Sequence, residues 1–144
     1  YLIEYNVRMG DPECQTILPK LQTDFFDIAM ACCLGKLSDL KLNWYNKKSV
    51  CVVVCSKGYP DNYEKNLLIK RINNIKFMEN EFLFHAGTKI DNGKIYSNGG
   101  RVLSFVCLSD SFKKSRNEII NKINLLNWNE GFFRKDIGFK VINE

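Results

Sequence analysis

A chain of 144 residues with a hydrophobic fraction of 45% is long enough to fold as one ordinary domain, and a charged fraction of 26% argues against wholesale disorder. Lys and Arg (21) exceed Asp and Glu (16) by five without a dense basic block, so nucleic-acid binding is not expected, although the charge is compatible with phosphate-bearing substrates. No apolar run could span a bilayer and no segment has the pattern of a signal peptide, so we expect a cytoplasmic protein without a membrane partner.

The six cysteines indicate a reducing compartment. They form no CxxC pair, and no histidine lies at ligand spacing from them, so a zinc site is not expected. Most lie inside apolar runs, such as residues 50–54 and 102–108, where a free thiol behaves as a small hydrophobe. A disulfide framework would be unusual in a chain of this length with this much core.

Residues 1–8 alternate between apolar and polar side chains, which predicts a β-strand. Glu4, Asn6 and Arg8 occupy even positions and therefore point to one side of that strand. A carboxylate and an amide carbonyl are hard oxygen ligands of the kind that Mg²⁺ requires, and an arginine beside them can hold a phosphate or a carboxylate. The alternative is the solvent-exposed polar face of an edge strand. Because the chain begins inside this strand and without Met, we expect it to be a piece of a longer polypeptide.

A turn at residues 9–12 leads into two predicted helices. Pro12 suits the first turn of the first helix. Thr23 and Asp24 have the residue types of an N-cap region for the second helix, which carries an apolar stripe and ends near Gly35.

Two acidic residues lie where the first helix begins. Asp11 and Glu13 could accept hydrogen bonds from an ammonium group, and Gly10 beside them frees the backbone to approach a ligand. The alternative is a turn whose acidic residues stabilise the helix N-terminus through its dipole.

The lysine-rich residues 37–48, beyond the second helix, are the predicted boundary region between two subdomains.

The second half has the pattern of an antiparallel meander with one amphipathic helix across a face, which is an α+β fold. Residues 49–56 form a continuous β-branched and cysteine run, typical of a strand buried on both faces. Residues 81–86 and 101–108 are two further predicted strands. Residues 66–80 fit either a strand or a short helix, and both interpretations stay open.

A hairpin and a helix complete this half. Predicted strands at residues 88–90 and 94–96 flank residues 91–93 (Asp-Asn-Gly), a combination typical of a tight hairpin turn. Asp110 or Ser111 is predicted to cap the helix. Its apolar positions recur at near-helical spacing: Phe112, Ile119, Ile120, Ile123 and Leu126.

Two glycine-rich segments, residues 85–89 and 98–101, form a third candidate site. Glycine-rich turns expose backbone N–H groups, and Lys89 and Arg101 could complete a cradle for an anion. The spacing is not that of a P-loop. The alternative is a pair of hairpin turns with surface charges beside them. His85, the only histidine, is interpreted as a structural residue rather than a base.

Five segments, in the same order along the chain, carry a resemblance to a known family: residues 4–13, 56–60, 84–89, 97–103 and 133–138. The first is similar to the end of the ATP-grasp domain in the phosphoribosylamine–glycine ligase (glycinamide ribonucleotide synthetase) family. The other four are similar to C-terminal segments of that family. The resemblance covers essentially the whole chain and identifies it as the C-terminal part of such an enzyme.

The chain departs from the family pattern at a few positions. Asp61, Asn62 and Asn66 stand where glycines are usual around the Tyr-Pro loop, and Met9 stands where Phe is common. The first set of changes puts the shape of that loop in doubt, but it does not affect the predicted metal site.

The resemblance implies that residues 1–40 are the end of an ATP-grasp domain and that residues 41–144 are the family's small C-terminal domain. It implies a ligase of de novo purine biosynthesis that joins glycine to 5-phosphoribosylamine, with ATP, to give glycinamide ribonucleotide, ADP and phosphate through a glycyl phosphate. The chain has no nucleophile–base pair and no ATP-gripping loop of its own. The upstream N-terminal and ATP-grasp parts of the same enzyme are therefore implied partners, and the segment alone is expected to be inactive.

The resemblance also implies a metal site and a catalytic arginine. Glu4 and Asn6 would ligate the Mg²⁺ or Mn²⁺ that bridges ATP phosphates, and Arg8 would face the reacting anions. In such ligases positioning and charge neutralisation do the chemical work, without a covalent enzyme intermediate.

The implied substrate-binding residues lie in two places along the chain. Asp11 and Glu13 would lie near the glycine and amine groups, and Lys89 and Arg101 would hold the ribosyl phosphate. Two alternatives stay open. One is a biotin-carboxylase-like enzyme, whose ATP-grasp domain ends in a similar E-x-N-x-R strand. The other is a non-catalytic basic module that binds anions.

Overall fold

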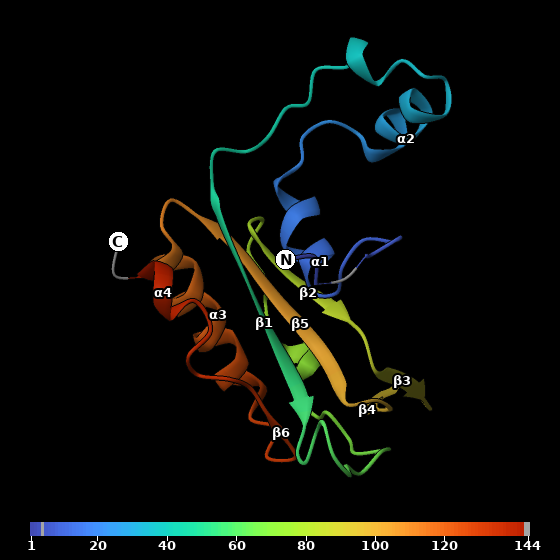
Figure 1. Ribbon diagram of the computed structural model, residues 1–144. Coiled ribbons are helices and arrows are strands. Elements are labelled where there is room, and N and C mark those ends of the chain that lie inside the picture. Colours follow the sequence, from blue (N-terminus) through green and yellow to red (C-terminus); the bar gives the residue numbers. More distant parts are fainter. Residues whose placement is uncertain (4, 143–144) are drawn as a thin grey trace.

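An antiparallel four-stranded sheet forms the body of the computed structural model, which describes residues 1–3 and 5–142 (Figure 1). Its strand order is β2-β5-β1-β6. The strands are β1 (Lys48–Ser56), β2 (Glu81–His85), β5 (Arg101–Ser109) and β6 (Gly131–Phe132). The two nine-residue strands, β1 and β5, pair from Lys48↔Ser109 to Cys55↔Arg101, with a bulge between Val54 and Cys55. Strands β1, β2 and β5 confirm the strands that the sequence predicted at residues 49–56, 81–86 and 101–108.

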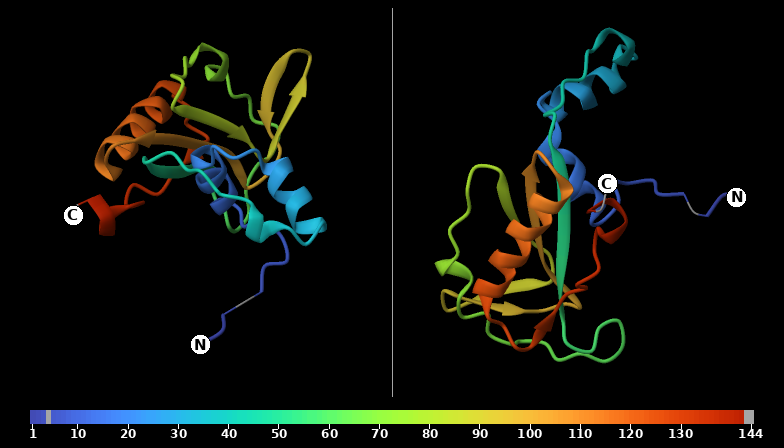
Figure 2. Two further views of the ribbon diagram at one scale, coloured as in Figure 1. Left: turned by 90° about the horizontal axis from the view of Figure 1, so that it is seen from above. Right: turned by 90° about the vertical axis from the view of Figure 1, so that its left-hand side faces the viewer.

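Helix α3 (Phe112–Leu126) covers one face of this sheet (Figures 1 and 2). Its buried residues are Ser115, Ile119, Ile123 and Leu126. The three apolar ones, Ile119, Ile123 and Leu126, pack with valines of β1 and with Phe105 and Leu103 of β5 in one hydrophobic core. The Ser111 side chain accepts a hydrogen bond from the Lys114 N–H, which confirms one of the two predicted caps. The α+β prediction of an antiparallel sheet with a packed helix is therefore confirmed.

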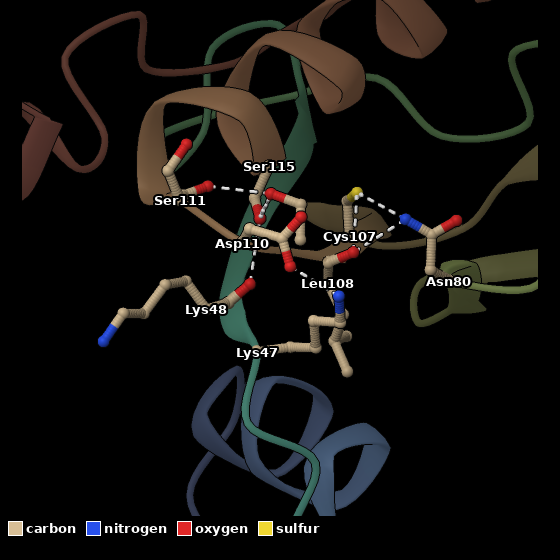
Figure 3. Close-up of polar contacts among 9 residues, drawn as sticks. Lys47, Lys48, Asn80, Cys107, Leu108, Asp110, Ser111 and Ser115 are labelled. Atoms are coloured by element: carbon tan, nitrogen blue, oxygen red, sulfur yellow. Dashed lines mark hydrogen bonds and ion pairs between the residues drawn. The ribbon is translucent and has the colours of Figure 1, made fainter.

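Polar contacts fix the start of α3 against the sheet (Figure 3). The Ser115 hydroxyl donates to the Lys48 carbonyl at 2.9 Å and lies 2.8 Å from the Ser109 hydroxyl. Lys47 and Asp110 form an ion pair at 2.5 Å beside it. Asn80 Nδ2 donates to the Leu108 carbonyl at 2.7 Å, which ties the start of β2 to β5. Because buried hydroxyls need partners, Ser115 fixes the position of the helix along β1.

The second face of the sheet is only partly covered. Helix α1 (Glu13–Ile17) lies against β1 and β5 there, and the 3-10 turn Leu18–Lys20 follows it. Along β1, buried residues such as Val52 alternate with half-buried residues such as Val53. Burial of β1 on both faces, as the sequence predicted, is therefore only half achieved within this chain.

The predicted hairpin is present as a separate two-stranded sheet, β3 (Thr88–Asp91) and β4 (Lys94–Ser97). Asn92 and Gly93 have φ angles of 47° and 73°, as a type I′ turn requires. In the ambiguous stretch, residues 66–80, the structure has one 3-10 turn, Ile72–Asn74, and an isolated bridge from Leu68 to Tyr96.

The strand predicted at residues 1–8 is wrong for the described part of that segment. Residues 1–3 and 5–8 form no strand, and the side chains of Ile3 and Val7 are almost fully exposed. A strand needs a neighbour for its backbone N–H and C=O groups, and no described strand lies next to this segment. The first residues lead away from the sheet instead (Figure 2).

Residues 21–47, which we call the arm, project from the body (Figure 1). The arm contains α2 (Phe25–Cys33) and the 3-10 turn Leu37–Asp39, and a bridge between Leu21 and Trp44 closes its base. The Asp24 carboxylate accepts from the Phe26 N–H at 2.8 Å, which confirms the predicted cap. No residue of α2 is buried. The apolar stripe that predicted this helix is therefore open to solvent.

The chain ends in a short helix, α4 (Phe139–Ile142), next to α3. Across the described residues, no helix combines the length and apolar character needed to cross a membrane. The domain boundary predicted at residue 40 and the cytoplasmic location stay predictions.

Candidate functional site

Two predicted substrate-binding residues, Asp11 and Arg101, meet although they lie 90 positions apart in the chain. Arg101 Nη1 donates to the Asp11 carbonyl at 2.9 Å, and Nη2 donates to Asp11 Oδ2 at 2.8 Å. Gln15 Nε2 donates to the other carboxylate oxygen, Oδ1, at 2.9 Å. We call these three residues the Asp11 junction. The side chains of Asp11 and Arg101 are 43% and 40% exposed, so the junction is open to solutes.

Local structure explains why these groups converge. Arg101 is the first residue of β5 and pairs with Cys55 at the bulge of β1. Asp11 lies in the turn before α1, which packs on the same strands. Gln15 lies one helical turn beyond Asp11, at the spacing at which Gln and Asp side chains meet on a helix. The end of the sheet and the start of α1 therefore build the junction together.

Glu13, the third predicted residue of this group, begins α1 and is exposed. Its carboxylate folds over Gly10, where an added Cβ would lie only 2.3 Å from Glu13 Oε2. The Cys14 N–H donates to the Gly10 carbonyl at 2.8 Å, which starts the helical turn. A side chain at position 10 would therefore displace the Glu13 carboxylate.

The predicted metal ligands, Glu4 and Asn6, lie in the first residues of the chain. Glu4 lies outside the described residues, so its placement stays a prediction. Asn6 is exposed in irregular backbone, and Arg8 donates to the Met9 carbonyl at 3.0 Å. Within residues 1–3 and 5–142, no group of three or more His, Cys, Asp or Glu side chains is placed to hold a metal ion.

The two glycine-rich segments pack against each other. The Gly87 N–H donates to the Arg101 carbonyl at 2.8 Å, and the Asn98 N–H donates to the Gly87 carbonyl at 2.7 Å. A Cβ at Gly87 would lie 2.6 Å from the Arg101 carbonyl and 2.7 Å from the Gly99 Cα. The glycines permit this close approach, which uses N–H groups that the anion-cradle interpretation required to be open.

The side chains around these turns differ in their surroundings. Lys89 is exposed on β3, whereas the Arg101 side chain at the start of β5 binds Asp11. His85 Nδ1 lies 3.0 Å from the Thr88 hydroxyl, which supports the structural interpretation of this histidine. The phosphate-binding role of Lys89 and Arg101 stays a prediction.

Burial keeps two cysteines in their thiol form. Desolvation raises the pKa of Cys51 to about 11, against weaker lowering effects from the Thr16 and Ser104 hydroxyls. Desolvation, reinforced by the Glu81 carboxylate, likewise raises the pKa of Cys107 to about 11. At neutral pH neither residue is a thiolate nucleophile.

Sequence reasoning missed two features. Gln15 was not singled out, although its i+4 spacing from Asp11 on a predicted helix was a usable signal. A cavity of about 510 Å³ beside the loop after β1 was also missed; its lining includes Lys57, Tyr63, Glu64 and Glu130. The cavity joins segments that are distant in sequence, so no local pattern could have indicated it.

Comparisons with known proteins agree over most of the chain. A profile of the family "Phosphoribosylglycinamide synthetase, C domain" matches residues 49–140. The phosphoribosylamine–glycine ligase of Caldanaerobacter subterraneus is 45% identical over 136 residues, which cover 94% of this chain and 32% of the relative. The bifunctional purine biosynthetic protein purD of Dictyostelium discoideum is 42% identical over 143 residues, which cover 99% of this chain and 18% of that protein.

A solved structure agrees as well. The crystal structure of phosphoribosylamine–glycine ligase from Thermotoga maritima matches with a TM-score of 0.68 at 28% identity, covering 96% of this chain and 33% of that one. This chain thus spans about a third of the length of the bacterial ligases that it matches. The extent and identity of these matches establish that the chain belongs to the phosphoribosylglycinamide synthetase family, in which it corresponds to the C-terminal part of the ligase.

Proposed function

We propose that this chain is part of an ATP-dependent ligase that joins glycine to 5-phosphoribosylamine. The products are glycinamide ribonucleotide, ADP and phosphate, which places the enzyme in de novo purine biosynthesis. The observation that carries this proposal is the 45% identity, over 94% of the chain, to a relative named phosphoribosylamine–glycine ligase. The upstream N-terminal and ATP-grasp parts of the same enzyme complete the ATP site, and the assembled ligase is cytoplasmic.

In this proposal the reaction has two steps. The glycine carboxylate attacks the γ-phosphorus of ATP and displaces ADP, which gives glycyl phosphate. The amine nitrogen of 5-phosphoribosylamine then attacks the glycyl carbonyl and displaces phosphate, which gives the amide. No enzyme nucleophile takes part, and the raised thiol pKa values of Cys51 and Cys107 are consistent with that. Catalysis depends on positioning the reactants and on stabilising negative charge.

The proposed metal ligands are Glu4 and Asn6. A carboxylate and an amide carbonyl form a hard oxygen donor pair that suits Mg²⁺ or Mn²⁺. When bound, the ion neutralises charge on the ATP phosphates. Arg8 stands two residues further on and is proposed to face the same anions.

The proposed substrate residues divide between two groups. Asp11 and Glu13 accept hydrogen bonds from substrate amino groups near the start of α1. Lys89 and Arg101 hold the ribosyl phosphate. An arginine side chain has five N–H groups. Arg101 uses two of them to donate to Asp11, so its guanidinium can donate further hydrogen bonds to an anion.

The metal assignment is tested by Glu4→Ala in the full-length ligase of which this chain is proposed to be a part. We expect turnover to fall below detection with Mg²⁺ or Mn²⁺ while the circular dichroism spectrum and Tm are retained. Glu79→Ala, which removes an exposed carboxylate outside the proposed site, is the matched control and should keep full turnover. Turnover of Glu4→Ala at the wild-type rate would remove the metal assignment.

A further inference from the structure

Asp11 is held at three acceptor atoms by two side chains. Arg101 binds its backbone carbonyl and Oδ2, and Gln15 binds Oδ1. An isolated surface ion pair orders its partners weakly, because each side chain keeps its freedom. Here the guanidinium binds backbone and side chain of the same residue, so it fixes the turn as well as the carboxylate.

The two side chains that donate to Asp11 come from different elements of the structure. Gln15 belongs to α1, which begins two residues after Asp11, whereas Arg101 belongs to β5 in the body. The carbonyl of Arg101 also accepts from the Gly87 N–H, so this arginine is fixed by the glycine turns. The sheet, through Arg101, and α1, through Gln15, thus set the position of the Asp11 carboxylate together.

We propose that Arg101 and Gln15 are positioning residues, which orient the Asp11 carboxylate toward the amino group of a substrate. This inference rests on the proposed function, since it assumes that Asp11 faces glycine or 5-phosphoribosylamine. It is an alternative to the phosphate contact proposed above for Arg101, and the test below decides between the two roles. Each carboxylate oxygen can accept two hydrogen bonds and receives one from the junction, so both oxygens keep capacity for an N–H donor.

The test is a double-mutant cycle in the full-length ligase, with KM measured separately for glycine, 5-phosphoribosylamine and ATP. We expect Asp11→Ala and Arg101→Ala each to raise KM for one amino substrate about tenfold and to leave KM for ATP unchanged. The substrate whose KM rises identifies the amino group. The double variant should be no worse than Asp11→Ala, because Arg101 acts through that carboxylate.

Two further variants separate positioning from simple structural support. Arg101→Lys keeps the charge but loses the two-point geometry, so its KM should lie between those of wild type and Arg101→Ala. Gln15→Ala should raise the same KM by a smaller factor, about threefold. If the effects of Asp11→Ala and Arg101→Ala on KM multiply in the double variant, Arg101 contacts the substrate independently of Asp11. If KM is unchanged and Tm is lowered, Arg101 only stabilises the fold. Either result overturns the proposal.

Hydrogen exchange distinguishes failure of this inference from failure of the proposed function. In the chain itself, Arg101→Ala should speed exchange of the Cys14 amide, which donates to Gly10, about tenfold. Lys47→Ala breaks a second ion pair that joins the N-terminal part of the chain to the body, Lys47–Asp110, and is the matched control, expected to leave that amide unchanged. If the full-length wild type forms no glycinamide ribonucleotide, the proposed function and the substrate role fall together. If exchange is unchanged, the junction does not order the turn and the inference fails alone.

Discussion

Helices α2 and α3 show that an apolar stripe does not determine whether a helix is buried. The sequence of α2, FFDIAMACC, is far more apolar than that of α3, FKKSRNEIINKINLL. Yet α2 buries none of its residues, whereas α3 buries four against the sheet. The difference lies in the partner: α3 has β1 and β5 beneath it, and α2 projects from the body in the arm. We propose that the upstream part of the ligase covers the apolar side of α2.

The largest difference between body and arm is expected in the stability lost when a phenylalanine is replaced by alanine. Phe105 is 1% exposed in the core, and Phe26 is 67% exposed on α2. Phe105→Ala should lower the free energy of unfolding of the chain by about 3–5 kcal/mol, because it leaves a cavity. Phe26→Ala should change it by less than about 0.5 kcal/mol. Urea denaturation of both variants measures the difference.

The same Phe26→Ala variant sharpens the comparison in the full-length ligase. If the upstream part covers α2, the substitution there should cost about 2–3 kcal/mol, since it removes a buried aromatic side chain. Phe105→Ala should be as costly as before. Equal tolerance of Phe26→Ala in both settings would mean that the arm stays exposed.

Replacing a glycine by alanine should also cost different amounts of stability in the body and in the arm. Gly87→Ala places a Cβ within 3 Å of backbone atoms and should cost about 1–3 kcal/mol through displacement of the turn. Gly35 has nothing within 4 Å but a φ of +66°, so Gly35→Ala should cost only about 1 kcal/mol of local strain. Thermal denaturation of both variants measures the difference. A larger loss of Tm for Gly35→Ala than for Gly87→Ala would contradict the close packing of the glycine turns.

Cysteines extend the comparison to pH. Burial raises the pKa of the Cys51 and Cys107 thiols from 9.0 to about 11, whereas Cys32 and Cys33 are exposed in the arm. Mass spectrometry after alkylation at pH 8 should therefore find Cys32 and Cys33 modified first. The folded chain binds these two protons more tightly than the unfolded chain. The contribution of these two thiols to stability should therefore be constant below about pH 9 and fall between about pH 9 and 11.

The replacement Cys107→Ser serves as the control for that pH dependence. It removes one of the two groups and should make the loss of stability between pH 9 and 11 shallower. An unchanged slope would assign the alkaline loss to other groups.

The smallest expected contrast concerns the helix caps. Ser111→Ala removes the cap of α3 and should lower the global free energy of unfolding by about 1 kcal/mol. Asp24→Ala removes an equivalent cap of α2, but this helix contributes nothing to the core, so the global value should change by only a few tenths of a kcal/mol. Similar global losses would show that α2 is coupled to the body.

Local chemistry made most of the body predictable. Residues 91–93 specify a turn with positive φ angles, Ser111 specifies a cap, and the β-branched run at residues 49–56 specifies a strand. Each of these signals acts within a few residues, so the rest of the molecule was not needed to interpret it.

Features that depend on a partner were harder to predict. Residues 1–8 have the alternating pattern of a strand, but no described strand pairs with them. A strand forms only where a neighbouring strand accepts and donates its backbone hydrogen bonds. Among the candidate residues, the contact of Asp11 with Arg101 joins segments 90 positions apart, which no spacing rule indicates. The glycine turns were interpreted as an anion cradle, yet their N–H groups are partly used to pack Gly87 against the start of β5.

The most direct test of the account is a turnover assay for glycinamide ribonucleotide, with ATP, glycine, 5-phosphoribosylamine and Mg²⁺ present. It compares residues 1–144 alone with the full-length ligase that contains them. The account predicts product from the full-length protein and none from the isolated segment. Product from residues 1–144 alone, or none from the full-length protein, would contradict it.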